Sequence, residues 1–172
     1  MRTIIAGVGY MNLSDSSVGP LVVQALKQES WPQNVTIDDL SYGPISVMHN
    51  LNEASPRYDR MIVVTAADFG APPPAMRWSR WSAPLPEAEL VQRRIEEAVT
   101  GVIDWENLLV ILQQFDVLPP ETWVIAVQPV ETEFGMHLSS GIAALLPEIS
   151  RVARGLATGE LSASAEPSHT HG

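Results

Sequence analysis

Apolar residues form short continuous runs along the chain, separated by longer segments with helical periodicity. Four runs predict β-strands, at residues 3–6, 35–40, 61–66 and 122–127. The last two are continuous rather than alternating, which is typical of strands buried on both faces of a parallel sheet. The intervals predict helices at residues 17–29, 45–51, 86–99, 105–115 and 139–156. Strands that alternate with helices indicate an α/β fold, a three-layer sandwich with a mostly parallel sheet and helices on both faces.

The segment Met76–Trp81 has a different pattern from these runs. It follows Pro72–Pro74, which cannot continue a strand, and its apolar and polar side chains alternate. This pattern predicts an edge strand or an exposed ribbon. Its tryptophans, Trp78 and Trp81, either pack on the body of the protein or contact a partner.

Length and composition predict one globular domain. A chain of 172 residues is long enough to bury a full core, and we place the domain at residues 1–160. Hydrophobic residues make up 45% and charged residues 17%, which is the composition of a folded and not a disordered chain. Residues 161–172 are small and polar and contain a proline, so we predict a flexible tail there.

Charge and cysteine content exclude several classes of function. The net charge of −10 argues against nucleic acid binding through a basic face. No apolar run approaches the roughly 18 residues that cross a bilayer, so we expect no membrane partner. Without cysteine there is no disulfide, no thiolate metal site and no cysteine nucleophile. The N-terminus enters a predicted strand without a basic segment before it, so we expect no secretory signal and a cytoplasmic protein.

The turn after the first predicted strand carries the strongest chemical signal. Residues 7–19 read GVGYMNLSDSSVG, between an apolar strand and an apolar helix. Such a turn builds a ligand site or a catalytic site at the carboxyl end of a buried strand. A dinucleotide fingerprint is a weak match, because Asn12 stands where the third glycine is needed.

Five motifs in order along the chain resemble those of hydrogenase maturation proteases, the nickel-sensing endopeptidases that trim the C-terminus of the [NiFe]-hydrogenase large subunit. They lie at residues 7–19, 58–70, 71–74, 118–129 and 135–139. The first is similar to the family pattern Gly-x-Gly-Asn-x-Leu-x-x-Asp-[Glu/Asp]-x-x-Gly. The resemblance covers about residues 1–157 and implies a twisted five-stranded sheet between helix layers.

The resemblance also implies three metal ligands, and this chain departs from the pattern at all three positions. Ser16 stands where the family has the acidic residue after Asp15, and Thr65 stands where it has the aspartate that closes the third strand. The third ligand is a histidine that opens a helix, and counting back from Leu118 places it at Gly101. Nickel and similar ions bind imidazole and carboxylate groups, so hydroxyls and a glycine should not hold them. In this family the nickel belongs to the substrate, and we predict no metal and no cofactor for the chain itself.

Other polar residues could substitute for the missing ligands, but each also has a structural explanation. Asp15 is expected to cap the following helix, which has Pro20 in its first turn. Asp68 fits a turn, and His137 fits a surface or capping position at the start of the last helix.

Three further histidines and two serines are weaker candidates. His49 lies on a short predicted helix, where a surface position explains it. His169 and His171 in the tail could bind metal loosely. A Ser-His-Asp triad built on Ser16 or Ser14 lacks the surrounding motif of a nucleophile elbow.

Three hypotheses of function follow. The first is a non-catalytic member of the protease family, a binding or assembly factor for the large-subunit precursor or for a maturation protein. The second is an active metal-dependent endopeptidase with a site rebuilt around Asp15, Asp68 and a histidine. The third is an unrelated α/β protein that binds a small molecule or nucleotide and shares only architecture.

Overall fold

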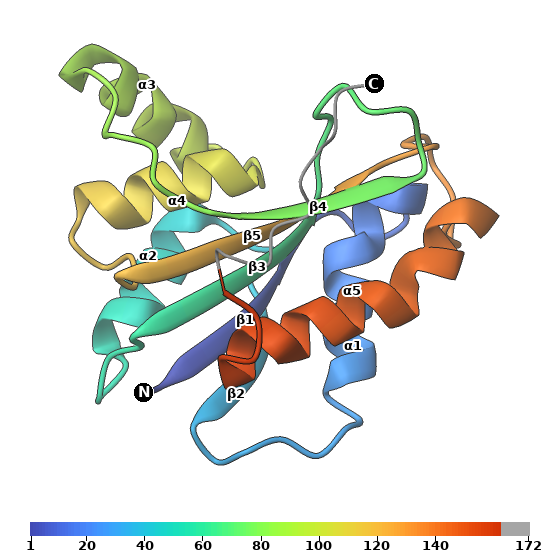
Figure 1. The fold of residues 1–172 in the computed structure, drawn as a ribbon. Helices are drawn as coiled ribbons and strands as arrows, with labels where there is room; N and C mark the ends of the chain where they lie inside the picture. Colours follow the sequence, from blue (N-terminus) through green and yellow to red (C-terminus); the bar gives the residue numbers. More distant parts are fainter. Residues whose placement is uncertain (163–172) are drawn as a thin grey trace, which may run out of the picture.

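The computed structural model describes residues 1–162, and these form a five-stranded sheet between two layers of helices (Figure 1). The strands are β1 (Thr3–Val8), β2 (Val35–Asp39), β3 (Arg60–Ala66), β4 (Ala75–Arg80) and β5 (Glu121–Gln128). Their order across the sheet is β2-β1-β3-β5-β4. The first four strands in this order pair in parallel, and β4 runs antiparallel to β5 at the edge. The predicted α/β sandwich with a mostly parallel sheet is confirmed, and the alternating segment forms its edge strand.

Helices cover both faces of the sheet (Figure 1). They are α1 (Val18–Leu26), α2 (Pro44–Glu53), α3 (Ala88–Val99), α4 (Trp105–Gln114) and α5 (Ser140–Thr158). Helices α1 and α5 pack on one face, and α2 and α4 pack on the other, with α3 lying on α4. Alternate residues of β1 divide between the two cores, because Ile4 and Ala6 face α2 and α4 whereas Ile5 faces α1 and α5. A short 3₁₀ helix, η1 (Ser14–Ser17), precedes α1.

The two tryptophans of the edge segment lie on opposite faces of the sheet. Trp78 packs in the core formed with α1 and α5. Trp81 contacts Trp105 edge to face, with ring centroids 6.0 Å apart, and donates a hydrogen bond to Gln113 Oε1 at 3.3 Å. Of the two alternatives predicted for this segment, both tryptophans therefore follow the first and pack on the body.

The first turn of α1 lies directly on the backbone of β1 and β3. A Cβ atom on Gly19 would lie 2.7 Å from the backbone N and O of Val8 and still closer to Val64 O. A Cβ on Gly7 would lie 2.5 Å from Gly19 O. Only glycine permits this approach, and it sets the position of the turn at residues 9–17 above the ends of the two strands.

Two predictions from the sequence concern membrane segments and the C-terminal tail. None of the helices in residues 1–162 is long and apolar enough to cross a membrane. The predicted flexible tail begins at residue 161, and all but its first two residues lie outside the described part of the chain. His169 and His171 are among those residues.

The Gly19 contact predicts that Gly19→Ala will destabilise the protein strongly. Helix propensity alone would favour alanine by about 1 kcal/mol. The overlap with the strand backbone should outweigh this gain and lower the free energy of unfolding by about 3 kcal/mol. Urea unfolding followed by circular dichroism measures the change, and an insoluble variant would also agree with the prediction.

Gly43→Ala is the matched control, because a Cβ at Gly43 meets nothing within 4 Å. Its free energy of unfolding should stay within about 1 kcal/mol of that of the wild type. Equal stability of the two alanine variants would contradict the packing argument.

Candidate functional site

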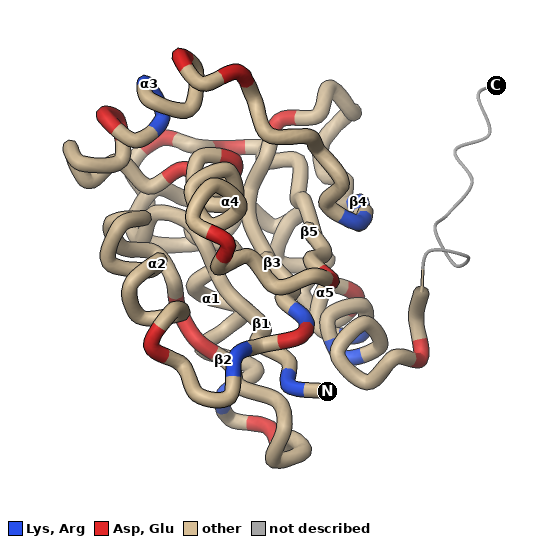
Figure 2. Tube along the Cα trace, turned by 90° about the vertical axis from the view of Figure 1, so that its left-hand side faces the viewer, with Lys and Arg blue, Asp and Glu red and all other residues tan. Residues whose placement is uncertain are grey.

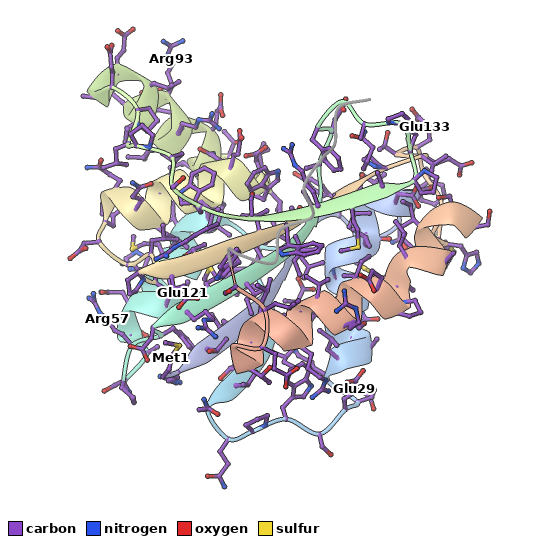
Figure 3. The ribbon with its side chains drawn as sticks, viewed as in Figure 1. Met1, Glu29, Arg57, Arg93, Glu121 and Glu133 are labelled. Carbon is purple, nitrogen blue, oxygen red and sulfur yellow. The ribbon has the colours of Figure 1, made fainter. Side chains whose placement is uncertain are left out.

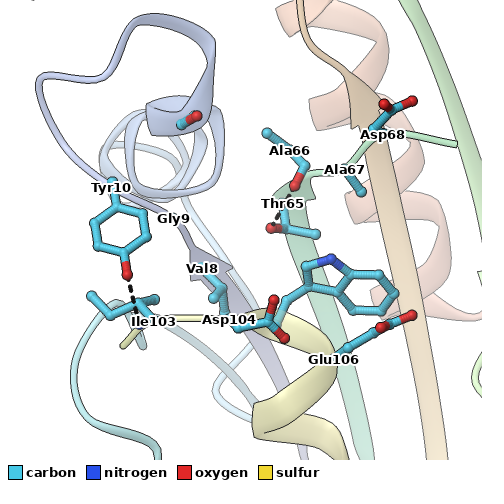
Figure 4. Close-up of a pocket in the computed structure, with 12 residues that line it drawn as sticks. Val8, Gly9, Tyr10, Thr65, Ala66, Ala67, Asp68, Ile103, Asp104 and Glu106 are labelled. Atoms are coloured by element: carbon cyan, nitrogen blue, oxygen red, sulfur yellow. Dashed lines mark hydrogen bonds between the residues drawn. The ribbon is translucent and has the colours of Figure 1, made fainter. Parts of the chain in front are cut away.

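A cavity of about 350 Å³ opens where the carboxyl ends of β1 and β3 meet the start of α4 (Figure 4). Residues from the β1 turn, from the end of β3 and from the entry to α4 line it. The chain runs from β1 to β2 on one side and then returns to place β3 on the other side of β1. The cavity therefore lies at the point where strand order reverses, which is where ligands bind in open α/β sheets.

Ser16 and Thr65 both line this cavity. Ser16 belongs to η1, and Thr65 lies one residue before the end of β3, paired in register with Val8. Thr65 is only 3% exposed, and its hydroxyl donates a weak 3.3 Å hydrogen bond to Ala66 O. The structure thus brings these two predicted site residues to one cavity, where each contributes a neutral hydroxyl.

Gly101 does not line the cavity, contrary to the expectation from counting along the sequence. It lies in the exposed turn after α3, with a positive φ of 82° that suits glycine. Helix α4 begins four residues later, and Asp104 is its N-cap, accepting a hydrogen bond from Asn107 N at 2.7 Å. The cavity is lined there by Ile103 to Glu106. The counted position therefore falls in the turn before α4, whose start at Trp105 agrees with the helix predicted from the sequence.

The sequence predicted the start of this helix at residue 105 but did not assign its N-cap Asp104 or its first residues, Trp105 and Glu106, to the cavity. An aspartate directly before an apolar-periodic segment is a typical N-cap, and this signal could have identified Asp104. Tyr10 was also not assigned a role. Its hydroxyl accepts a 2.7 Å hydrogen bond from Ile103 N and thereby joins the β1 turn to the α4 entry across the cavity (Figure 4).

Carboxylates surround the mouth of the cavity. Asp68 accepts hydrogen bonds from Gly70 N at 3.0 Å and from Gln128 Nε2 at 3.1 Å, and these bonds lower its pKa. Asp104 and Glu106 lie 4.0 and 3.9 Å from the guanidinium of Arg94. Asp68 therefore lines the cavity, as a substitute ligand would, and it also forms the turn that its position before Gly70 predicts.

The lining residues offer hydroxyls and carboxylates but no histidine. Within residues 1–162, no three His, Cys, Asp or Glu side chains lie in an arrangement that could hold a metal ion. Ser16 has no neighbouring imidazole in the cavity to act as a base. The arrangement suits the binding of a ligand with donor or cationic groups more than nucleophilic chemistry.

Asp15 does not cap its own helix and does not line the cavity. Its side chain is fully buried and accepts four hydrogen bonds from the segment that precedes α5. Oδ2 accepts from Val130 N, Glu131 N and Ser139 Oγ at 2.9, 2.9 and 2.8 Å, and Oδ1 accepts from Ser139 N at 2.8 Å. The expected cap is therefore wrong: the N-cap of α1 is Ser17, and Asp15 instead fixes residues 130–139 against the β1 turn.

The same segment carries His137, which is exposed and does not line the cavity. Neighbouring backbone bonds reinforce the connection, since Ser14 N donates to Gly135 O and Gly135 N donates to Asn12 O, both at 3.0 Å. Ser14 adopts a strained positive φ of 48° within this arrangement.

His49 is exposed on α2 and also lies outside the cavity lining.

The hydrogen bonds between the Asp15 carboxylate and residues 130–139 depend on pH, because the carboxylate is charged. Burial by itself raises the pKa of Asp15, but the hydrogen bonds from Glu131, Ser139 and Val130 outweigh burial and hold the pKa below its ordinary value. A lowered folded-state pKa stabilises the protein above the unfolded-state pKa. That contribution is lost as the pH falls through the folded-state value.

Asp15→Asn should therefore lower the free energy of unfolding at pH 7 by about 3 kcal/mol, because a charged acceptor of several buried hydrogen bonds is lost. The difference in free energy of unfolding between wild type and variant should become smaller as the pH falls below about 4. Urea titrations at several pH values measure both effects.

Asp38→Asn is the control, because Asp38 is exposed and makes a single ion pair, with Lys27 at 3.4 Å. This substitution should change the free energy of unfolding by less than about 1 kcal/mol. A destabilisation by Asp15→Asn that does not change with pH would contradict the role of the charge.

Comparisons with known proteins agree with this geometry. The hydrogenase maturation protease (HycI) family model matches residues 20–154. The hydrogenase 2 maturation peptidase of a Thaumarchaeota archaeon is 24% identical, covers 92% of this chain and 99% of its own, and superposes with a TM-score of 0.65. The hydrogenase maturating endopeptidase HybD of E. coli is 20% identical, with coverage of 93% and 94% and a TM-score of 0.68.

A third solved structure, the [NiFe] hydrogenase maturation protease HycI of Thermococcus kodakarensis, is 20% identical, with coverage of 91% and 90% and a TM-score of 0.57. At these identities the solved structures establish the fold alone. No curated protein matches the sequence. The family model covers most of the chain, and this removes the hypothesis that the protein shares only an architecture with these proteases. The chain belongs to the hydrogenase maturation protease family.

Proposed function

We propose that the protein acts in [NiFe]-hydrogenase maturation as a non-catalytic factor that binds the large-subunit precursor. Family membership supports the pathway and makes a hydrogenase partner plausible. The observation that carries the non-catalytic role is the pair of neutral hydroxyls, Ser16 and Thr65, that face one cavity. The resemblance to the protease pattern implies carboxylate ligands at both positions.

The cavity chemistry supports binding without metal sensing. A serine or threonine hydroxyl is neutral and a weak donor of electron pairs to nickel, so two of them hold a divalent ion poorly. The cavity nevertheless keeps its shape, because the Gly19 contact and Asp15 fix the turn that forms one wall. A maturation protein is the alternative partner for the same surface.

One observation favours a second function, an active metal-dependent endopeptidase. Asp68, Asp104 and Glu106 all line the cavity, so carboxylates remain close to the family position. From the sequence we expected this site around Asp15, Asp68 and a histidine. Of these, Asp68 lines the cavity, whereas Asp15 and His137 do not.

The non-catalytic proposal predicts weak nickel binding. Calorimetric titration of the full-length His169→Ala, His171→Ala variant with nickel should give no saturable heat below about 1 mM, since a neutral donor set offers little affinity. Replacing the two tail imidazoles removes a source of loose binding elsewhere in the chain.

Adding Ser16→Glu and Thr65→Asp to this background should tighten nickel binding at least about tenfold, because two carboxylates then face the cavity. Stoichiometric nickel binding by the protein with Ser16 and Thr65 intact would contradict the proposal.

The proposal further predicts that the large-subunit precursor is bound but not cleaved. Purified protein and nickel-loaded precursor should co-elute on gel filtration, and mass spectrometry should show an intact precursor C-terminus. Specific removal of the C-terminal extension would establish the endopeptidase instead.

The endopeptidase alternative makes its own prediction. The triple variant Asp68→Asn, Asp104→Asn, Glu106→Gln should then lose cleavage by at least about a hundredfold, since each carboxylate would be a ligand or a base. Unchanged cleavage in the triple variant would exclude these three residues.

A further inference from the structure

A second cavity, of about 400 Å³, adjoins the first at the edge of the sheet. The two cavities share four lining residues: Ala67, Asp68, Trp105 and Glu106. The two cavities are therefore adjacent, and together they extend from the ends of β1 and β3 to β4. Val124 and Ala126 of β5, each 5% exposed, lie at the base of the second cavity and give it an apolar floor.

The β4 end of this pair of cavities carries a positive charge. Arg77 of β4 lines the second cavity, and its guanidinium lies over the ring of Phe69, 4.4 Å from the ring centroid. The side chains of a strand alternate, so Arg77 lies on the same face of β4 as Ser79, and Trp78 faces the opposite core. Arg80 also lines this cavity, but its guanidinium donates to Pro120 O at 3.3 Å.

Arg77 is a cation without a carboxylate partner among residues 1–162. Five of the nine arginines form ion pairs. Three others, Arg2, Arg57 and Arg80, donate to backbone carbonyls instead. The contact with Phe69 orients the guanidinium without using its hydrogen-bond donors. Those donors remain available for a planar carboxylate, which the guanidinium recognises through two parallel bonds.

The two ends of this pair of cavities have opposite charge. Asp104 lines only the first cavity and Arg77 only the second, whereas Asp68 and Glu106 line both, as does Trp105. Figure 2 shows the basic residues of β4 at the edge of the sheet, apart from the acidic residues of the helical layer that contains α4. A polyanion such as a nucleotide would be repelled at the acidic end. An extended peptide can place apolar side chains on the floor and charged groups of both signs at the ends.

We propose that the two cavities form a single peptide-binding cleft, in which Arg77 pairs with a carboxylate of the bound peptide. Asp104, at the other end, attracts a cationic or donor group, so the charges fix the direction of the chain. This inference extends the proposed function, and the identity of the natural peptide rests on that function. The bound segment of the partner contains an acidic residue.

The test uses full-length protein and an array of short synthetic peptides in which one fixed position carries Asp, Asn or Lys and the others vary. Wild type should retain the Asp peptides about three- to tenfold more strongly than the Asn peptides. Arg77→Met keeps the apolar stem and should abolish this preference, and Arg77→Glu should prefer the Lys peptides. The preference of the wild type should weaken in 1 M salt, because screening weakens exposed ion pairs.

Arg93→Met is the matched control, because Arg93 is an exposed arginine on α3 (Figure 3) and lines neither cavity. It should keep the wild-type preference for Asp peptides. An Arg77→Met variant that keeps the preference, or a wild type that shows none or binds no peptide, would overturn the inference. Far-ultraviolet circular dichroism of each variant shows that it is folded.

Binding of the whole precursor is measured separately by gel filtration. If the precursor is not bound but an acidic preference depends on Arg77, the cleft inference stands and the proposed function fails. If the precursor is bound equally by wild type and Arg77→Met, and the array shows no acidic preference, the proposed function stands and the inference fails.

Discussion

The direct contact between the first turn of α1 and the backbone of β1 and β3 is the constraint on which the rest of the site depends. Gly19 lies against the backbone of Val8 and Val64 where no side chain fits. This close approach brings η1 over the strand ends, so Ser16 of η1 faces Thr65 of β3. Without it, the turn would stand farther from the sheet and the cavity would lose one wall.

Asp15 provides the second constraint, because it connects the β1 turn to a segment near the C-terminal end of the fold. Its buried carboxylate holds residues 130–139, which lead from β5 into α5. One buried charge is stable here because four hydrogen bonds compensate for the loss of water. Two adjacent residues therefore have separate tasks. Asp15 faces the protein interior and ties two loops together, whereas Ser16 faces the cavity.

The fold and the chemistry of the site are set by different residues. The glycines, the buried Asp15 and the sheet hold a fold that this chain shares with hydrogenase maturation proteases. The cavity that they build is lined by hydroxyls and carboxylates, and a second cavity lined by Arg77 lies next to it. The same fold can carry different donor groups, because fold does not fix function.

The sequence by itself determined the architecture. Continuous apolar runs such as Met61–Ala66 predicted strands buried on both faces, and the alternating segment after the prolines predicted an edge strand or an exposed ribbon. A mostly parallel sheet between helix layers therefore followed from hydrophobic burial. The order of the strands did not follow from it and is known from the structure. The turn with Gly7, Gly9 and Gly19 located the site at a strand end. These features are local, because the hydrophobic effect buries apolar runs of this kind in any folded chain.

Only the tertiary structure decided which polar groups meet. Counting along the chain placed Gly101 in the site, whereas the three-dimensional turn brings Asp104 there. Asp15 was expected to cap its own helix, but its partners lie more than a hundred residues away, at Val130 and Ser139. The position of Trp105 beside both cavities is likewise a property of packing. Contacts between distant segments depend on the exact path of each loop, and local periodicity does not encode that path.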